Sequence, residues 1–236
     1  MRIPRRSAAV AERMRRTWDA AAGSGEARVL GTGESAERQV ERILSLLGPA
    51  PDGMCLEVGC GDGRMTVELA RRFAGVLAVD VSPLMLERAA QRGLENVRLQ
   101  RVSGLALDGV PDRCAAVVVC YGVLQHLPRK ALVARLLAEV ARTLAPDGKA
   151  VVHLPVLAPT VRARSWRLAR AAAVSVRARL SRGFDQSPAY QGVRLTEAEL
   201  RRALRRAGLR DRGRLDLPSY FPHAANVLLR LEHDVR

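Results

Sequence analysis

The stretch Leu56-Glu57-Val58-Gly59-Cys60-Gly61-Asp62-Gly63-Arg64, followed by Val79-Asp80, decides the fold of this chain. It has the pattern of a buried strand, a glycine-rich turn that opens a helix, and a second strand that ends in an acid. Glycines at alternate positions let the backbone approach a ligand where a Cβ would block it. The helix that starts near Arg64 offers free N–H groups to that ligand, and Asp80 can accept both hydroxyls of a ribose. The pattern predicts a nucleoside-type cofactor at the carboxyl ends of parallel strands.

The dinucleotide fingerprint G-x-G-x-x-G competes with this interpretation, and it fails on spacing. Gly63 is followed by Arg64-Met65-Thr66, with no glycine where close packing of the helix needs one. Glu57 instead precedes the first glycine by two residues, and E-x-G-x-G-x-G resembles motif I of the class I S-adenosylmethionine (SAM) methyltransferases. The resemblance implies that Glu57 organises the turn near the methionine part of SAM. It also implies that Asp80 holds the ribose hydroxyls.

Further blocks resemble this family in the same order along the chain. They are a second-strand block (Val79–Leu86), a block after the fourth strand (Cys120–Pro128), a helix and turn before the fifth strand (Glu139–Gly148), and a helix that enters the sixth strand (Leu195–Leu200 with Ala207-Gly208-Leu209). The resemblance is strongest over residues 54–155 and points to the small-molecule, methyltransferase type 11/12-like branch. It implies an α/β fold, with a doubly wound, seven-stranded, mostly parallel Rossmann-like sheet.

Alternating strand and helix signals predict the elements themselves. We expect strands at 54–58, 75–80, 96–102, 115–120 and 150–154, with a later pair near 208–217 and 225–231, and helices at 64–73, 83–92, 129–144 and 196–207. Pro146-Asp147-Gly148 is typical of a turn between a helix and a strand. Strands separated by helices of this length form a parallel sheet covered on both faces.

Three segments define the expected organisation of the chain. Residues 1–48 are predicted to form a helical cap over the cofactor, with helices packed on the sheet edge as an equal alternative. Residues 49–236 form the SAM-binding domain, in which 156–192 is an insertion that covers the acceptor site. Within it, 160–182 has one apolar and one arginine-rich helical face. That helix either packs as a lid over the acceptor pocket or presents its basic face to an anionic acceptor or a membrane surface.

Composition narrows the class of protein. The 236 residues suffice for one domain with a core, and no stretch reaches eighteen uncharged apolar residues. The N-terminus lacks an apolar run behind its arginines, so we expect a cytoplasmic protein with no membrane span and no secretory signal. The four cysteines (Cys55, Cys60, Cys114, Cys120) lack C-x-x-C spacing, which favours reduced, buried thiols over a metal site.

The net charge of +15 comes almost entirely from arginine, since Lys130 and Lys149 are the only lysines. Such a skew with abundant alanine is typical of a GC-rich coding sequence. A basic surface is compatible with nucleic acid, but aromatic residues are 3% of the chain and provide no stacking platform. The composition therefore does not favour a nucleic-acid partner.

The resemblance carries a set of cofactor contacts onto this chain. They are Glu57, Gly59, Cys60, Gly61, Asp62, Asp80, Val81, Met85, Ser103, Gly104, Leu105, Cys120 and Tyr121. Two positions depart from the family pattern. Ser103 stands where an acid usually meets the adenine amino group, and Ala116 stands where an acid commonly opens the fourth strand. A neutral acceptor is weaker than a charged one, so affinity for SAM is modest or a backbone carbonyl meets the adenine.

His126 is the best candidate for a catalytic base. It lies six residues past Cys120, on the cofactor side of the sheet, and imidazole suits proton transfer near neutral pH. A loop-shaping or pocket-lining role is the alternative. His153 fits a satisfied core histidine. We expect Trp18, His126, Tyr190 and His223 to contact the acceptor. No nucleophile triad or metal-binding pattern emerges.

The sequence thus predicts an enzyme that transfers a methyl group from SAM to an oxygen or nitrogen of a small molecule. A secondary metabolite or a sugar-containing intermediate fits best by resemblance. One alternative is an RNA or protein methyltransferase, although Cys120-Tyr121-Gly122-Val123 stands where an N-P-P-Y-type block would bind a flipped base. The other is a non-catalytic SAM-fold partner subunit, which the departures at Ser103 and Ala116 support.

Overall fold

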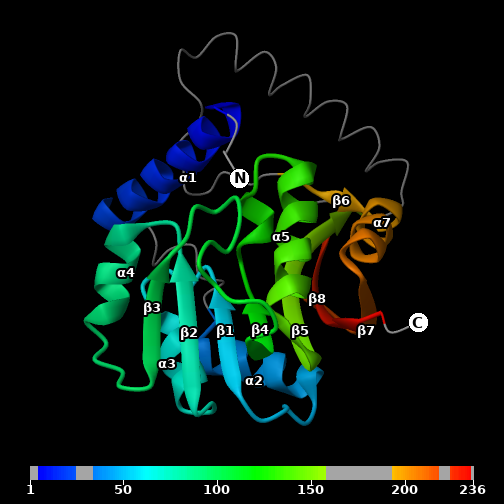
Figure 1. Cartoon of the computed structure of the whole chain (residues 1–236), viewed down its shortest axis with the longest axis horizontal. Helices are drawn as coiled ribbons and strands as arrows, with labels where there is room; N and C mark the ends of the chain where they lie inside the picture. The colour runs from blue at the N-terminus through cyan, green and yellow to red at the C-terminus, as the bar shows by residue number, and fades with distance from the viewer. Residues whose placement is uncertain (1–4, 25–33, 158–192, 218–223, 235–236) are drawn as a thin grey trace.

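The computed structural model describes residues 5–24, 34–157, 193–217 and 224–234, which build one sheet flanked by helices (Figure 1). In chain order the elements are α1 (Arg5–Ser24), α2 (Ala36–Leu47), β1 (Met54–Val58), α3 (Arg64–Ala70), β2 (Gly75–Asp80), α4 (Pro83–Ala90), β3 (Val97–Arg101), β4 (Ala115–Cys120), the 3-10 helix η2 (Leu124–His126), α5 (Lys130–Thr143), β5 (Leu144–Leu157), β6 (Leu195–Thr196), α7 (Glu197–Ala207), β7 (Leu209–Leu217) and β8 (Ala224–His233).

The strand order confirms the predicted doubly wound sheet. In the described residues the strands run β3-β2-β1-β4-β5-β8-β7, with the two-residue β6 paired beside β5. The first five strands are parallel, and β8 runs antiparallel to both β5 and β7. The order reverses between β1 and β4. Ligands of open parallel sheets bind at such a switch point, beyond the carboxyl ends of the strands.

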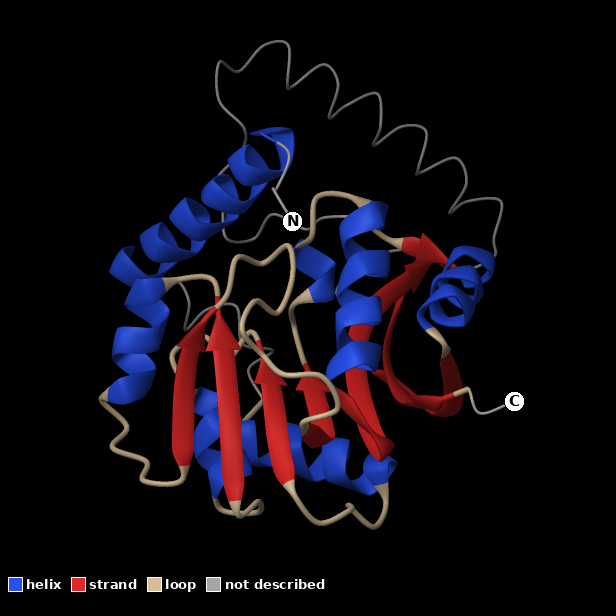
Figure 2. Ribbon diagram, in the orientation of Figure 1, coloured by secondary structure: helices blue, strands red, loops and turns tan. Residues whose placement is uncertain are grey.

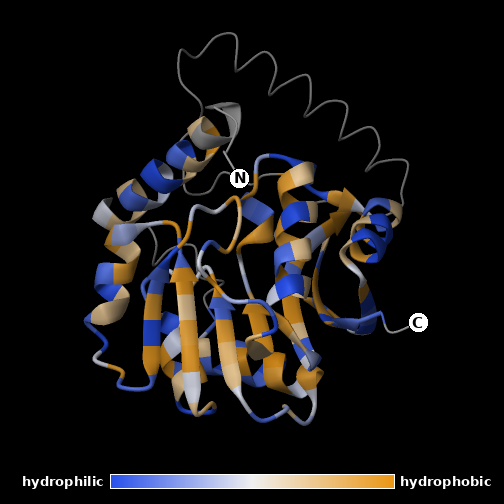
Figure 3. Ribbon diagram, viewed as in Figure 1, coloured by the Kyte–Doolittle hydropathy of each residue, from blue (hydrophilic) through white to orange (hydrophobic). Residues whose placement is uncertain are grey.

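Helices cover both faces of the sheet (Figure 2). Alternate strand residues point to opposite faces, so Leu56 packs in the apolar cluster that includes α5 and α7, while Cys55 packs in the cluster that includes α2 and α3. All six residues of β4 are buried. Figure 3 shows the consequence: the central strands are hydrophobic along their length, and the helices carry polar residues on their outer sides.

The predicted strands and helices are present, but several of their bounds differ, most of all at β5. The predicted turn at 146–148 lies inside β5, which begins at Leu144 directly after α5. Leu144 is buried and pairs with Ala115, and the register between the two strands then shifts before Val117 pairs with Lys149. Pairing with β4 therefore draws this proline-containing segment into the strand as an irregularity. Helices α3 and α4 end at Ala70 and Ala90, earlier than predicted.

Helix α1 lies along the edge of the sheet where the strands end, next to α4 (Figure 1). Its final residue is Ser24, which follows Gly23. The predicted insertion helix at 160–182 lies outside the described residues. Among the described helices, none has the length and apolar character needed to cross a membrane.

Candidate cofactor and acceptor site

The glycine turn after β1 is packed from one side and open on the other. The N–H groups of Gly59 and Cys60 donate to the carbonyl of Val79, at 2.8 and 3.1 Å. Gly59 and Gly61 have φ of 77° and 55°, the left-handed region that favours glycine. A Cβ on Gly59 would lie 2.2 Å from Cγ2 of Val123, whereas a Cβ on Gly61 would meet no atom within 4 Å. The turn therefore offers free space at Gly61.

Asp80, the last residue of β2, joins that turn to the start of α4. Its Oδ2 accepts from the N–H of Gly61 and its Oδ1 accepts from the N–H of Ser82, each at 2.9 Å. Burial raises the pKa of the Asp80 carboxyl, and the N–H groups of Ser82 and Gly61 oppose that rise. Each carboxylate oxygen keeps a second lone pair for a ligand hydroxyl. Asp80 thus keeps acceptor capacity at the edge of the glycine turn, and its contact with a ribose stays a prediction.

Glu57 is a second buried acid at the same edge. Its side chain accepts from the hydroxyl of Thr66 at 2.6 Å. Burial raises the pKa of Glu57 to about 8, Thr66 opposes the rise, and the nearby Asp80 adds to it. Two acids taken out of water so close together favour a cationic ligand. SAM carries a sulfonium and an ammonium, so these residues fit it.

Three other predicted cofactor contacts are Asp62 and Cys60 in the glycine turn and Cys120 at the end of β4. Asp62 pairs with Arg92 at 3.2 Å, beyond the end of α4, so its carboxylate is directed to that cation. Cys60 and Cys120 are buried free thiols. Burial raises the pKa of the Cys120 thiol to about 12 and that of Cys60 further still. Both thiols are therefore protonated and act as small apolar groups, not as nucleophiles.

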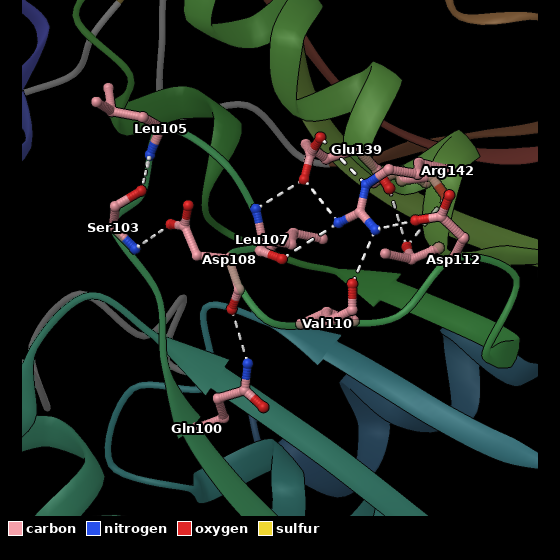
Figure 4. A network of polar contacts seen from close by, with 11 residues as sticks. Gln100, Ser103, Leu105, Leu107, Asp108, Val110, Asp112, Glu139 and Arg142 are labelled. Carbon is pink, nitrogen blue, oxygen red and sulfur yellow. Dashed lines mark hydrogen bonds and ion pairs between the residues drawn. The ribbon is translucent and has the colours of Figure 1, made fainter. Parts of the chain in front are cut away.

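The turn after β3 contains an acid that the sequence analysis missed. The hydroxyl of Ser103 accepts from the N–H of Leu105 at 3.2 Å, and the N–H of Ser103 donates to Oδ2 of Asp108 at 2.9 Å (Figure 4). Gln100 anchors Asp108 by donating to its carbonyl at 2.8 Å. The carboxylate of Asp108 thus lies at the turn where Ser103 replaces the acid that usually meets the adenine amino group in the family. The signal was weak, because Asp108 comes five residues after Ser103.

Helix α5 holds the rest of this loop in place (Figure 4). The N–H of Leu107 donates to Glu139 at 2.8 Å. The guanidinium of Arg142 donates to the carbonyls of Val110 and Leu107 at 2.8 and 3.2 Å, and it pairs with Asp112. One arginine therefore satisfies several groups of a loop that has no strand partners of its own.

The turn after β4 is set by a histidine from the neighbouring strand. The ring of His153, on β5, stacks on Tyr121 with centroids 4.6 Å apart and 19° between the planes. Its Nδ1 accepts from the N–H of Gly122 at 3.3 Å. Burial lowers the pKa of His153 to about 4, and the nearby His126 lowers it further. His153 is therefore neutral and satisfied, as predicted for a core histidine.

His126 lies in η2, at the end of the same loop. The indole of Trp18, on α1, meets its ring edge to face, with centroids 5.0 Å apart and 84° between the planes. The structure thus brings together two residues predicted to contact the acceptor. Val123, in the same loop, is the residue that packs against Gly59, so the His126 loop lies directly on the glycine turn.

Helix α1 contacts residues that follow three different strands. Ser82 donates its hydroxyl to Asp19 at 2.6 Å, and Trp18 packs in an apolar cluster with Met85. A Cβ on Gly104 would lie 2.6 Å from a methyl of Val81 and 3.2 Å from Met14. Together with the contact to His126, these interactions place α1 across the candidate site. Asp19 had no signal in the sequence, because a single acid on a helix has many surface roles.

Two predicted acceptor residues cannot be placed in this arrangement, and one departure from the family pattern lies away from it. Tyr190 and His223 lie outside the described residues. Ala116 is buried near the amino end of β4, beside Gly53, whereas the candidate site lies at the carboxyl end. Ala116 therefore lies away from the candidate site.

Comparisons with known proteins agree with this geometry. Residues 55–148 match the family model of a methyltransferase domain. Trans-aconitate 2-methyltransferase of Deinococcus radiodurans is 34% identical over 115 residues, 48% of this chain and 42% of that protein. Ubiquinone biosynthesis O-methyltransferase of Idiomarina loihiensis is 30% identical over 159 residues, 66% of this chain and 61% of that protein. The chain spans about two fifths to three fifths of the length of these curated relatives.

A solved structure extends the likeness over nearly the whole chain. Magnesium protoporphyrin IX methyltransferase from Synechocystis PCC 6803, with bound S-adenosylhomocysteine (SAH), has a TM-score of 0.63 at 18% identity and covers 93% of this chain and 98% of that one. Strand order and glycine turn define a Rossmann-like methyltransferase fold. Residues 55–148 therefore match a methyltransferase domain, within a chain whose described part has the fold of Rossmann-like SAM-dependent methyltransferases.

Proposed function

We propose that this protein transfers the methyl group of SAM to an oxygen atom of a small molecule, with His126 as the general base. The observation that carries the proposal is the position of the His126 loop. Val123 packs against Gly59 in the glycine turn, and His126 meets Trp18 from the covering helix. A base, an aromatic wall and the cofactor turn thus share one edge of the sheet.

The cofactor would bind over Gly61, where the turn leaves free space. SAM supplies an electrophilic methyl group on a positively charged sulfur. Glu57 and Asp80 would face its cationic methionine part and its ribose, and the turn at Ser103–Leu105 would meet the adenine. Asp108 supports this last contact, because its carboxylate accepts a hydrogen bond from the N–H of Ser103 and so fixes the turn.

The protein must hold the acceptor oxygen about 3 Å from the methyl carbon, in line with the bond that breaks. A hydroxyl acceptor also has to lose its proton, for which a positioned imidazole is suited. His153 does not compete for that proton, since its Nδ1 accepts from Gly122 and its ring is buried. His126 is the histidine that remains for the reaction in the described site.

An oxygen acceptor is favoured by the relatives, one of which is an O-methyltransferase of ubiquinone biosynthesis. A secondary metabolite or a sugar-containing intermediate is the substrate class that we propose, and the arginine-rich composition also suits an anionic acceptor. We propose that residues 1–48, which include α1, form a cap over the domain at 49–236. The contacts of α1 support this role. The segment 156–192 completes the proposal as the lid of the acceptor site.

A panel of hydroxyl acceptors tests this function, with SAH release as the readout for wild type and His126→Ala. We expect His126→Ala to bind SAH normally and to methylate about 10²- to 10⁴-fold more slowly. His233→Ala is the matched control, because His233 ends β8 and contacts the carbonyl of Leu144 at the opposite end of the parallel strands. Full activity of His126→Ala on the best acceptor would refute the assignment of the base.

A further inference from the structure

The side chain that precedes His126 contacts its ring directly. Nε2 of Gln125 lies 3.1 Å from Nε2 of His126, within the same turn of 3-10 helix. A carboxamide nitrogen only donates hydrogen bonds. A hydrogen bond from this amide therefore needs the lone pair of Nε2, which the tautomer with its proton on Nδ1 provides.

Two contacts together fix the orientation of this ring. Gln125 contacts the ring at Nε2, while the indole of Trp18, on α1, meets the ring with 84° between the planes. Neither contact alone would define both the position of the nitrogen and the tilt of the ring. A base has to present one particular lone pair to its substrate, so this double constraint is useful for catalysis.

We propose that Gln125 is a positioning residue for His126, whose amide selects the Nδ1–H tautomer and reserves Nε2 for the proton of the acceptor. The inference rests on the proposed function, because it assigns a task to Gln125 only if His126 acts as the base. The acceptor hydroxyl takes the place of the amide at Nε2. Its proton passes to Nε2, its oxygen forms the bond to the methyl carbon, and the electron pair of the broken bond stays on sulfur in SAH. The imidazolium then returns its proton to solvent.

Two variants separate this role from simple packing. Gln125→Met keeps the length of the side chain and removes the donor, and Gln125→Glu offers only an acceptor, which favours a proton on Nε2. The ¹⁵N NMR spectrum of His126, assigned by its loss in His126→Ala, reports the tautomer without any acceptor. We expect the Nδ1–H form in wild type, its loss in Gln125→Met, and the Nε2–H form in Gln125→Glu.

The kinetic expectation is specific to positioning. Both variants should lower kcat about 10-fold or more while the KM for SAM stays within about twofold, because the cofactor contacts are untouched. Calorimetric binding of SAH confirms that each variant is folded. Gln91→Met is the control, because Gln91 is an exposed glutamine after α4. We expect it to leave the tautomer of His126 and kcat unchanged.

The two proposals fail in different ways. Suppose that the rate depends on His126 but its tautomer is the same in wild type, Gln125→Met and Gln125→Glu. This result overturns the role of Gln125 alone. An enzyme that keeps its full rate in His126→Ala overturns the proposed function, and the positioning role with it. A tautomer that follows the variants, with kcat reduced in both, supports the role.

Discussion

Replacing Glu57 with glutamine should change how the free energy of unfolding depends on pH. Burial raises the pKa of Glu57 from its ordinary value of 4.5 to about 8. The folded protein therefore holds this proton more tightly than the unfolded chain does. The stability that follows is present in full below pH 4.5 and is lost as the pH rises through about 8.

The size of this effect follows from the difference between the two values. At about 1.4 kcal/mol for each tenfold change in proton affinity, a pKa that moves from 4.5 to about 8 corresponds to a loss on the order of 5 kcal/mol at high pH. Glutamine stays neutral at every pH, and its carbonyl still accepts from the hydroxyl of Thr66. The free energy of unfolding of Glu57→Gln should therefore not fall in this way at high pH.

Urea unfolding of the ligand-free protein at about pH 5 and about pH 9 measures the effect. We expect wild type and Glu57→Gln to be similar at the lower pH, with the variant more stable by several kcal/mol at the higher one. Glu87→Gln makes the same chemical change on the exposed side of α4 and should follow wild type. Parallel pH dependence of wild type and Glu57→Gln would refute the raised pKa.

Three other substitutions test the site and its supports. Asp80→Ala should weaken SAH binding by about 1–3 kcal/mol in a calorimetric titration, and unchanged affinity in a folded variant would place Asp80 outside the site. Ser82→Ala removes the group that caps α4 and donates to Asp19, so thermal unfolding should show a loss of about 1 kcal/mol and limited proteolysis should cut α1 faster. Arg142→Leu should lower the unfolding free energy by about 1–3 kcal/mol, because buried loop carbonyls lose their donor; a Tm equal to that of wild type would contradict this.

The sequence predicted most of the fold because its signals are local. The strands β1, β2 and β4 are short apolar runs between turns, and their predicted bounds agree with the structure. The start of β5 could not be predicted, because it depends on the pairing of Leu144 with Ala115 on another strand. Pro146 favours a turn in isolation, and tertiary pairing overrides that preference.

The same contrast between local signals and tertiary contacts holds for the candidate site. The motif in the sequence placed the glycine turn and Asp80 at neighbouring strand ends, and the bond from the N–H of Gly61 to Asp80 joins them there. The stacking of His153 on Tyr121 and the bond from Ser82 to Asp19 join elements far apart in the chain. Such contacts depend on where tertiary packing places each element, and no spacing in the sequence encodes them. Trp18 was predicted to contact the acceptor, but its meeting with His126 required the position of α1.

Calorimetric titration of the purified protein with SAM and with SAH, with NAD as the control ligand, tests the central claim most directly. The buried acids Glu57 and Asp80 and the open turn at Gly61 predict micromolar binding of both adenosyl ligands and no binding of NAD. A folded protein that binds neither SAM nor SAH would contradict the account.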